Sequence, residues 1–186
     1  MAEDDDENDY FFIIDEINRG NLSKIFGELF MLIEKDKRGI ELQLLYSDEN
    51  FSVPANVYII GMMNTADRSL AMLDYALRRR FSFFTMKPGF NAPGFQAYQD
   101  SLKSDDFNKL IACVKQLNSK IAEDISLGEG FCIGHSYFCS LTPETANTQT
   151  LSSIVEYELI PLLKEYWFDE PAKIVDWSDR LRSAVK

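Results

Sequence analysis

The first third of the chain alternates between short apolar runs and one stretch with helical spacing. Residues 10–14 read Tyr-Phe-Phe-Ile-Ile, residues 57–63 read Val-Tyr-Ile-Ile-Gly-Met-Met, and both runs stop at polar side chains. Short runs rich in aromatic and β-branched residues are typical of strands buried on both faces in a parallel sheet. Residues 22–33 instead repeat apolar side chains every three or four positions, which predicts an amphipathic helix. We therefore expect a strand, a crossover helix and a second, parallel strand.

The pattern changes near residue 88. Before it, we expect a small hairpin, a short helix and a third strand, at residues 41–53, 70–77 and 81–86. Two Pro-Gly pairs, at residues 88–89 and 93–94, then interrupt the chain. Beyond them the apolar spacing is helical, over residues 107–122, 151–166 and 172–185. The predicted organisation is a lead-in at residues 1–9, an α/β domain at 10–87 and an all-α domain at 88–186.

Composition narrows the class of protein. The 186 residues are 46% apolar, enough for one or two folded cores, and no apolar run approaches the length of a membrane span. The net charge of −11 argues against a broad face that grips nucleic acid, and six acidic side chains fall in the first nine residues, which predicts a frayed lead-in. Three cysteines and no secretory signal favour a reducing, cytoplasmic compartment.

Polar side chains follow both predicted strands at the point where each strand ends. Asp15 and Glu16 come directly after the first strand, and Asn64 follows the second. Because the carboxyl ends of parallel strands meet at one edge of a sheet, we expect these three residues to lie close together. An apolar strand ending in Asp-Glu is the pattern of a Walker B element, in which the aspartate holds hydrated Mg²⁺ and the glutamate orients the attacking water. The alternative is that the two acids only begin the next loop.

Three longer blocks resemble the McrB family, the AAA+ GTPase motor subunits of modification-dependent restriction systems. They are IIDEINRGN at residues 13–21, GMMNTADRS at 61–69 and LDYALRRRF at 73–81, and the resemblance continues at residues 134–138 and 158–166. MNTADRS is close to a family signature and is more specific than a Walker B pattern. The resemblance implies an α/β fold, a partial P-loop AAA+ core of parallel strands with crossover helices on the Walker B side, followed by an all-α helical lid.

The resemblance also implies roles for individual residues. Asp15 and Glu16 would be the Walker B pair, with Mg²⁺ held by Asp15 through water, and Asn64 would be the sensor that places the hydrolytic water. Asn18 and Arg19 would contact the nucleotide edge or the next subunit. Near the same edge, two further residues of the signature would fix Asn64 or read the partner that stimulates hydrolysis: Asp67 and Arg68. For the last two, the alternative is an aspartate at a helix N-terminus and a surface arginine.

The arginine run at residues 78–80 would supply a finger to a neighbouring subunit's nucleotide, because a rigid guanidinium suits developing phosphate charge. Arg80 and then Arg79 are the candidates. Favourable interaction with the helix macrodipole accounts equally for at least one of the three. The single histidine, His135, is interpreted as a hydrogen-bonded packing residue in the lid rather than a group that touches nucleotide.

One element of such a site is missing from the sequence. A phosphate loop reads GxxxxGK[ST], and none of the nine glycines is followed by lysine. The chain thus resembles the second half of an AAA+ module with its lid, either as a truncated gene product or as an excised piece, and we do not expect it to turn over nucleotide alone.

The function expected from the resemblance is McrB-like hydrolysis of GTP or ATP, with Mg²⁺, by a hexamer-like ring. The ring would drive a McrC-like endonuclease subunit on modified DNA, and this chain would meet DNA only indirectly. Two alternatives stay open: a nucleotide-free interaction module, or a decayed paralogue that joins the ring. Neither form requires a membrane.

Overall fold

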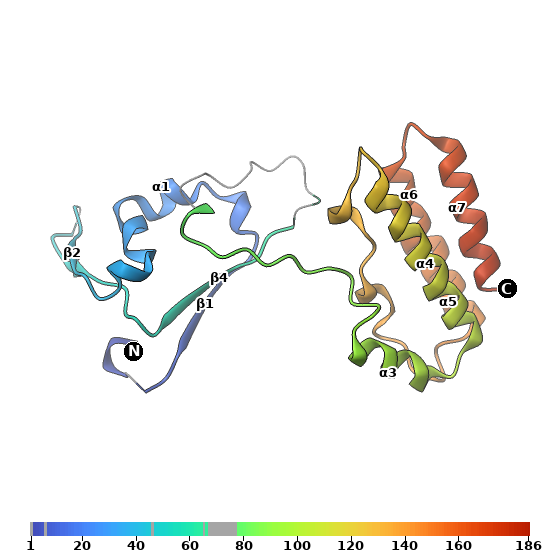
Figure 1. The fold of residues 1–186 in the computed structure, drawn as a ribbon, viewed down its shortest axis with the longest axis horizontal. Helices are drawn as coiled ribbons and strands as arrows, with labels where there is room; N and C mark the ends of the chain where they lie inside the picture. Colours follow the sequence, from blue (N-terminus) through green and yellow to red (C-terminus); the bar gives the residue numbers. More distant parts are fainter. Residues whose placement is uncertain (1, 6, 46, 65, 67–77) are drawn as a thin grey trace. The chain divides into compact units, whose positions relative to one another are not determined.

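The structure is a computed structural model in which the chain forms two compact units, Met1–Phe84 and Thr85–Lys186 (Figure 1). It describes residues 2–5, 7–45, 47–64, 66 and 78–186. The predicted helix at residues 70–77 therefore lies outside the described residues, as do Asp67 and Arg68.

A parallel strand pair organises the first unit. Strand β1 (Tyr10–Ile14) pairs with β4 (Val57–Gly61) in the register Tyr10↔Val57 to Ile14↔Gly61, which confirms the two predicted strands and their direction. A small antiparallel hairpin, β2 (Leu42–Gln43) and β3 (Asn50–Phe51), lies within the predicted hairpin. The helical segments are η1 (Ala2–Asp4), η2 (Ile17–Arg19), α1 (Leu22–Phe26), η3 (Gly27–Ile33) and η4 (Lys35–Lys37), all 3₁₀ except α1.

Two expectations for this unit are wrong. The α-helix predicted at residues 22–33 stops at Phe26, because Gly27 adopts a left-handed conformation (φ 50°), and the remainder is 3₁₀. Residues 82–86 form no strand and pair with no described strand, although the sequence predicts one at 81–86. A strand needs a partner strand as well as an apolar pattern, and among the described residues the parallel sheet contains only β1 and β4.

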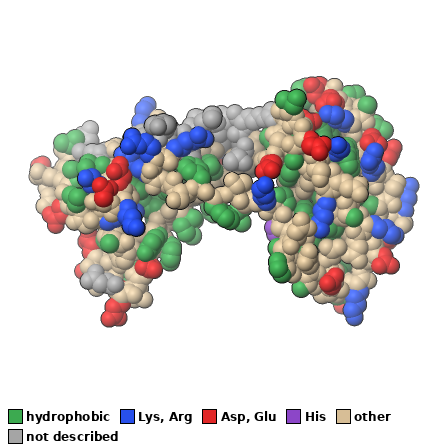
Figure 2. All heavy atoms as spheres, in the orientation of Figure 1, with side chains coloured by type: hydrophobic (Ala, Val, Ile, Leu, Met, Phe, Trp, Pro, Cys, Tyr) green, Lys and Arg blue, Asp and Glu red, His purple; other side chains and the backbone are tan. Residues whose placement is uncertain are grey.

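The burial of the strands also differs from the prediction. The apolar pattern predicts burial on both faces, yet Phe11, Phe12 and Ile13 are each more than half exposed. The core of this unit is a small cluster in which Ile14 and Ile59 pack against buried residues of the helical segments, among them Phe30 and Ile33. One face of a two-stranded sheet is thus covered, and apolar side chains gather on the surface of the unit (Figure 2).

The acidic start of the chain is tied down where it is described. The Asn56 side-chain amide donates to the carbonyl oxygens of Ala2, Asp5 and Asn8, at 3.2, 2.7 and 3.0 Å. The Tyr10 hydroxyl donates to the Asp5 carboxylate at 2.8 Å. These contacts differ from the frayed lead-in that the charge run predicts, because a neutral amide satisfies the backbone of the turn whatever the side-chain charges are.

The second unit is helical. Its elements are α3 (Pro93–Leu102), α4 (Asp105–Glu123), η5 (Glu129–Phe131), η6 (His135–Phe138), α5 (Thr148–Ile154), the π-helical η7 (Val155–Leu159), α6 (Ile160–Tyr166) and α7 (Pro171–Ala184). The three helices predicted from periodicity are confirmed, the middle one as α5, η7 and α6 in succession. The sequence interpretation missed α3, because Pro93 and Gly94 count as helix breakers there, whereas proline is well tolerated in the first turn of a helix.

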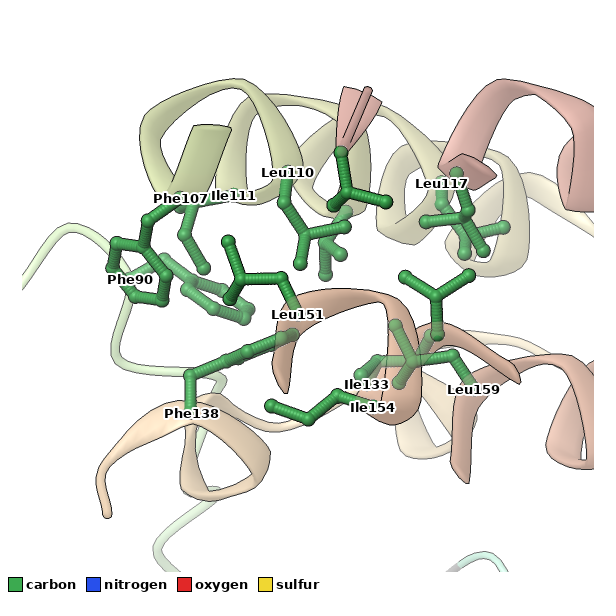
Figure 3. Close-up of a cluster of buried hydrophobic side chains, with 14 of the residues drawn as sticks. Phe90, Phe107, Leu110, Ile111, Leu117, Ile133, Phe138, Leu151, Ile154 and Leu159 are labelled. Carbon is green, nitrogen blue, oxygen red and sulfur yellow. The ribbon is translucent and has the colours of Figure 1, made fainter. Parts of the chain in front are cut away.

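The core of the second unit is built around α4. One face of this helix buries Phe107, Leu110, Ile111, Val114, Leu117 and Ile121, none more than 1% exposed (Figure 3). The Ser104 side chain caps the helix by accepting from the Phe107 N–H. The Asn118 side chain donates to the Ile133 carbonyl oxygen (2.9 Å) and accepts from its N–H (2.7 Å), which fixes the glycine-rich segment before η6 on α4.

Within the part of the chain that the structure describes, no helix combines the length and apolar character needed to cross a membrane.

Candidate functional site

The candidate site is the edge of the sheet where β1 and β4 both end. The ladder continues past the strands, because the Met62 N–H donates to the Ile14 carbonyl oxygen (2.8 Å) and the Ile17 N–H donates to that of Met62 (2.9 Å). Asp15 follows β1 directly and is exposed, and Asn64 follows β4 and is also exposed. The parallel register therefore brings the two carboxylates and the amide predicted from the sequence to the same edge.

Glu16 has an unusual backbone conformation. Its φ and ψ are 51° and 45°, in the left-handed region that residues other than glycine rarely adopt. The turn is held by hydrogen bonds from the Glu16 N–H to Asp15 Oδ1 (2.9 Å) and from the Arg19 N–H to the Glu16 carbonyl oxygen (2.8 Å). The Arg19 Nε lies 3.3 Å from Glu16 Oε2, so the predicted pair Glu16 and Arg19 are direct partners. Strained conformations of this kind cluster at functional sites.

Gly61 and Ile17 hold this turn against the sheet, and the sequence interpretation named neither. Ile17 is 6% exposed, and a Cβ at Gly61 would lie only 2.5 Å from its Cδ1. A side chain at position 61 would push Ile17 away and move the residues on either side of it. The available signal was a lone glycine inside an apolar strand, which indicates close approach of another group.

Asn18 supplies a buried oxygen without a partner. Its Oδ1 is inaccessible to solvent and accepts no hydrogen bond from the described residues. Buried carbonyl oxygens are normally satisfied, so this oxygen is available to a donor outside the described residues. The Asn64 Oδ1, in contrast, accepts from the Ala66 N–H at 3.1 Å, which fixes the start of the turn after β4.

The three arginines at residues 78–80 differ in how far their side chains are enclosed. The Arg80 Nη2 lies 2.6 Å from Glu34 Oε1, and its Cζ lies 4.5 Å above the centre of the Phe30 ring. The Arg80 side chain is 19% exposed, whereas Arg78 and Arg79 are both exposed. Arg80 is thus held within its own unit. No cluster of three or more His, Cys, Asp or Glu side chains that could share a metal ion occurs in the described ranges.

Comparison with known proteins agrees with the two units. The model of the AAA domain (dynein-related subfamily) matches residues 4–81, and the model of the McrB α-helical lid domain matches residues 109–175. The chain is also similar to the type IV methyl-directed restriction enzyme EcoKMcrB subunit of Escherichia coli K12, 51% identical over 97% of this chain and 42% of that subunit. The chain belongs to the McrB family of AAA+ proteins.

A second relative is more distant. The BsuMI component YdiS, a type II restriction enzyme component of Bacillus subtilis 168, is 29% identical over 66% of this chain. The chain spans 42% of the length of each of these two relatives. Within the McrB family, the first unit is part of an AAA+ core and the second is a helical lid, which confirms the predicted fold class.

Proposed function

We propose that the chain contributes the carboxylate edge and the lid of a McrB-type ring that hydrolyses GTP or ATP. The observation that carries the proposal is the arrangement at the end of β1, where Asp15 is exposed and Glu16 is turned into a left-handed conformation beside the end of β4. The left-handed backbone gives the Glu16 side chain a defined direction at the strand end, which a water-orienting carboxylate requires.

The residues at this edge suit hydrated Mg²⁺. The exposed Asp15 carboxylate is the hard oxygen ligand that Mg²⁺ prefers. When bound, the ion would neutralise charge on the nucleotide phosphates. Glu16 would orient the attacking water and accept its proton, with Arg19 fixing the direction of the carboxylate. Asn64 would hold that water from the neighbouring strand end.

The trans-acting arginine is best assigned to Arg79. The sequence favours Arg80 first, but its pairing with Glu34 and its position over Phe30 occupy that guanidinium inside the unit. Arg79 is exposed and directly precedes this fixed point. Arg80 would then anchor the segment from which Arg79 extends toward the nucleotide of the next subunit.

The relatives suggest the wider system. Both are named as restriction enzyme subunits or components, so we propose that the ring works in a restriction system with a McrC-like endonuclease subunit. The sequence contains no phosphate loop. The phosphates would be held by a segment or subunit that carries one, and the McrB-like ring would be hexamer-like. Because the sequence contains no phosphate loop, one alternative function is a nucleotide-free interaction module that joins the ring through its lid.

The test is reconstitution with a McrB-family subunit that carries a phosphate loop. Nucleotide hydrolysis and co-elution are measured for the wild-type chain, for Glu16→Gln and for Arg79→Ala, with Arg78→Ala as the matched control. We expect the first two variants to co-elute normally but to change hydrolysis by the mixture at least tenfold, and the control to match wild type. Normal hydrolysis with Glu16→Gln, together with co-elution, would support the interaction module instead. Failure of the wild-type chain to co-elute would contradict both functions.

A second measurement concerns the chain alone. Calorimetry with GTP, ATP and Mg²⁺ should show no micromolar binding, since the phosphate loop supplies most contacts to the β- and γ-phosphates. Micromolar binding by the isolated chain would show that another part of it replaces that loop.

A further inference from the structure

The segment that leads into the lid is bound to the lid at three successive points. The Lys87 Nζ lies 3.1 Å from Glu129 Oε2, the Gly89 N–H donates to His135 Nδ1 at 3.0 Å, and Phe90 is 3% exposed in the lid core. The ion pair is largely exposed, so it contributes little. The hydrogen bond and the buried ring are therefore the contacts that fix this segment.

The His135 ring is held in place by aromatic neighbours. It meets Phe90 and Phe95 edge to face, with ring centres 6.2 and 5.8 Å apart. These contacts leave Nδ1 directed at the Gly89 backbone. Gly89 is required at the contact, because a Cβ there would lie 3.0 Å from His135 Cε1 and within 3.3 Å of both ring nitrogens.

The bond defines the chemical state of His135. A ring nitrogen that accepts an N–H must carry a lone pair, so this hydrogen bond requires Nδ1 to be without hydrogen. A phenylalanine at this position would fill the same space between the aromatic rings but would leave the Gly89 N–H without its acceptor. Packing and hydrogen bonding at His135 can therefore be separated by mutation.

The residues just before this segment are held much less. Phe84 and Met86 are 89% and 86% exposed, and residues 82–86 take part in no ladder with the described strands. Few buried contacts and no regular backbone hydrogen bonding are the features of a segment that opens at low cost.

We propose that His135 is the anchor that makes Lys87–Phe90 part of the lid, so that the connecting segment is fixed from Lys87 onward and is held weakly only before it. The inference does not depend on nucleotide hydrolysis and uses the chain alone. It assigns to the single histidine a hydrogen-bonding role toward the connecting segment, in addition to packing within the lid.

The test compares three substitutions by amide hydrogen exchange at Gly89 and by the rate of chymotrypsin cleavage after Phe90, which is 3% exposed while the segment is bound. His135→Phe keeps the ring and removes the acceptor; His135→Asn places an amide oxygen near the position of Nδ1; His135→Gln places it near that of Nε2. We expect exchange and cleavage to accelerate roughly three- to tenfold in the Phe and Gln variants, because each loses one neutral hydrogen bond. In the Asn variant both rates should change less than about twofold. In Lys87→Gln, which removes only the exposed ion pair, Gly89 exchange and cleavage after Phe90 should both stay within about twofold of wild type.

A role in packing alone predicts the reverse order, with Phe close to wild type and Asn the most exposed to exchange, and that result would overturn the proposal. Fluorescence of the two tryptophans, both in the lid, reports whether each variant is folded. If His135→Phe does not fold, Gly89→Ala provides the same test from the other side. Its methyl group would press against the ring while the histidine remains, and unchanged cleavage after Phe90 in that variant would equally contradict the anchor.

Discussion

Asp124 joins three parts of the lid, and its charge gives a pH-dependent prediction. It caps α4, and its side chain is only 9% exposed. Oδ2 accepts from Trp167 Nε1 at 2.9 Å and from Lys173 Nζ at 3.0 Å, and Oδ1 accepts from the Ser126 N–H at 2.8 Å. The hydrogen bond from Trp167, and then that from Lys173, hold the pKa of Asp124 below its ordinary value.

The perturbation is Asp124→Asn, which keeps the volume and one acceptor oxygen but removes the charge. A hydrogen bond to a charged group contributes about 1.5–3 kcal/mol, against about 0.5–1.5 for a neutral one, so the Trp167 bond should weaken by about 1 kcal/mol. The half-exposed Lys173 adds little to this, because solvent screens its charge. We expect a total loss of about 1–2 kcal/mol at pH 7, which for a unit of this size lowers Tm by roughly 5–10 °C.

The sign of the pH dependence follows from the lowered pKa. A carboxyl group whose pKa is lower in the folded state stabilises the fold above its unfolded pKa of about 3.9 and loses that contribution as the pH falls. The difference between wild type and Asp124→Asn should therefore be full at pH 6–7 and shrink below about pH 4. Raising the pH above 6 should not enlarge it.

Thermal unfolding followed by tryptophan fluorescence measures this difference selectively, because both tryptophans lie in the lid and are buried. Asp176→Asn is the matched control, since its partner Arg180 is one turn away and both side chains are 54% exposed. We expect the control to stay within about 0.5 kcal/mol of wild type. Equal stability of Asp124→Asn and wild type at pH 7, or a difference that persists undiminished at pH 3, would refute the reasoning.

Three further predictions concern particular contacts. Phe107→Ala removes a ring that is 0% exposed and should cost about 3–5 kcal/mol in chemical unfolding of the lid; a cost below 1 kcal/mol would contradict the assigned core. Asn118→Ala leaves the N–H and carbonyl of Ile133 without their partner, so it should lower the free energy of unfolding by about 2–4 kcal/mol and speed amide exchange at Ile133. Unchanged amide exchange at Ile133 would show that water replaces the lost side chain. Glu34→Ala removes the carboxylate that holds Arg80 and should speed trypsin cleavage after Arg80 several-fold, whereas an unchanged rate would show that the ion pair does not anchor the segment.

Some structural differences from the sequence predictions have a common physical origin. The two paired strands were predicted from continuous apolar runs and the lid helices from a spacing of about 3.6 residues, and these predictions were confirmed, whereas the strand predicted at residues 81–86 was not. The ends of elements depend on single backbone conformations. Gly27 ends α1 because it is left-handed, and Pro93 begins α3 because a first-turn proline needs no N–H partner. Neither outcome can be told from composition alone.

The candidate site divides in the same way. The sequence alone identified Asp15, Glu16 and Asn64 and brought them to one edge, because the direction of parallel strands is enough to place the residues at the end of each strand. The role proposed for Glu16 is tested by the Glu16→Gln variant. Partners that lie far apart in the chain could not be predicted, since sequence patterns describe faces of elements and not which faces meet.

The sequence by itself therefore determined the family, the order of the two domains and the residues at the sheet edge. Only the tertiary structure decided that Glu16 adopts a left-handed turn over Gly61, that Glu34 occupies Arg80, and that Asp124 meets Trp167. Each of these pairings joins segments whose approach depends on the packing of a whole unit. A local pattern sets what a residue can do, and the three-dimensional neighbours select which of those interactions is made.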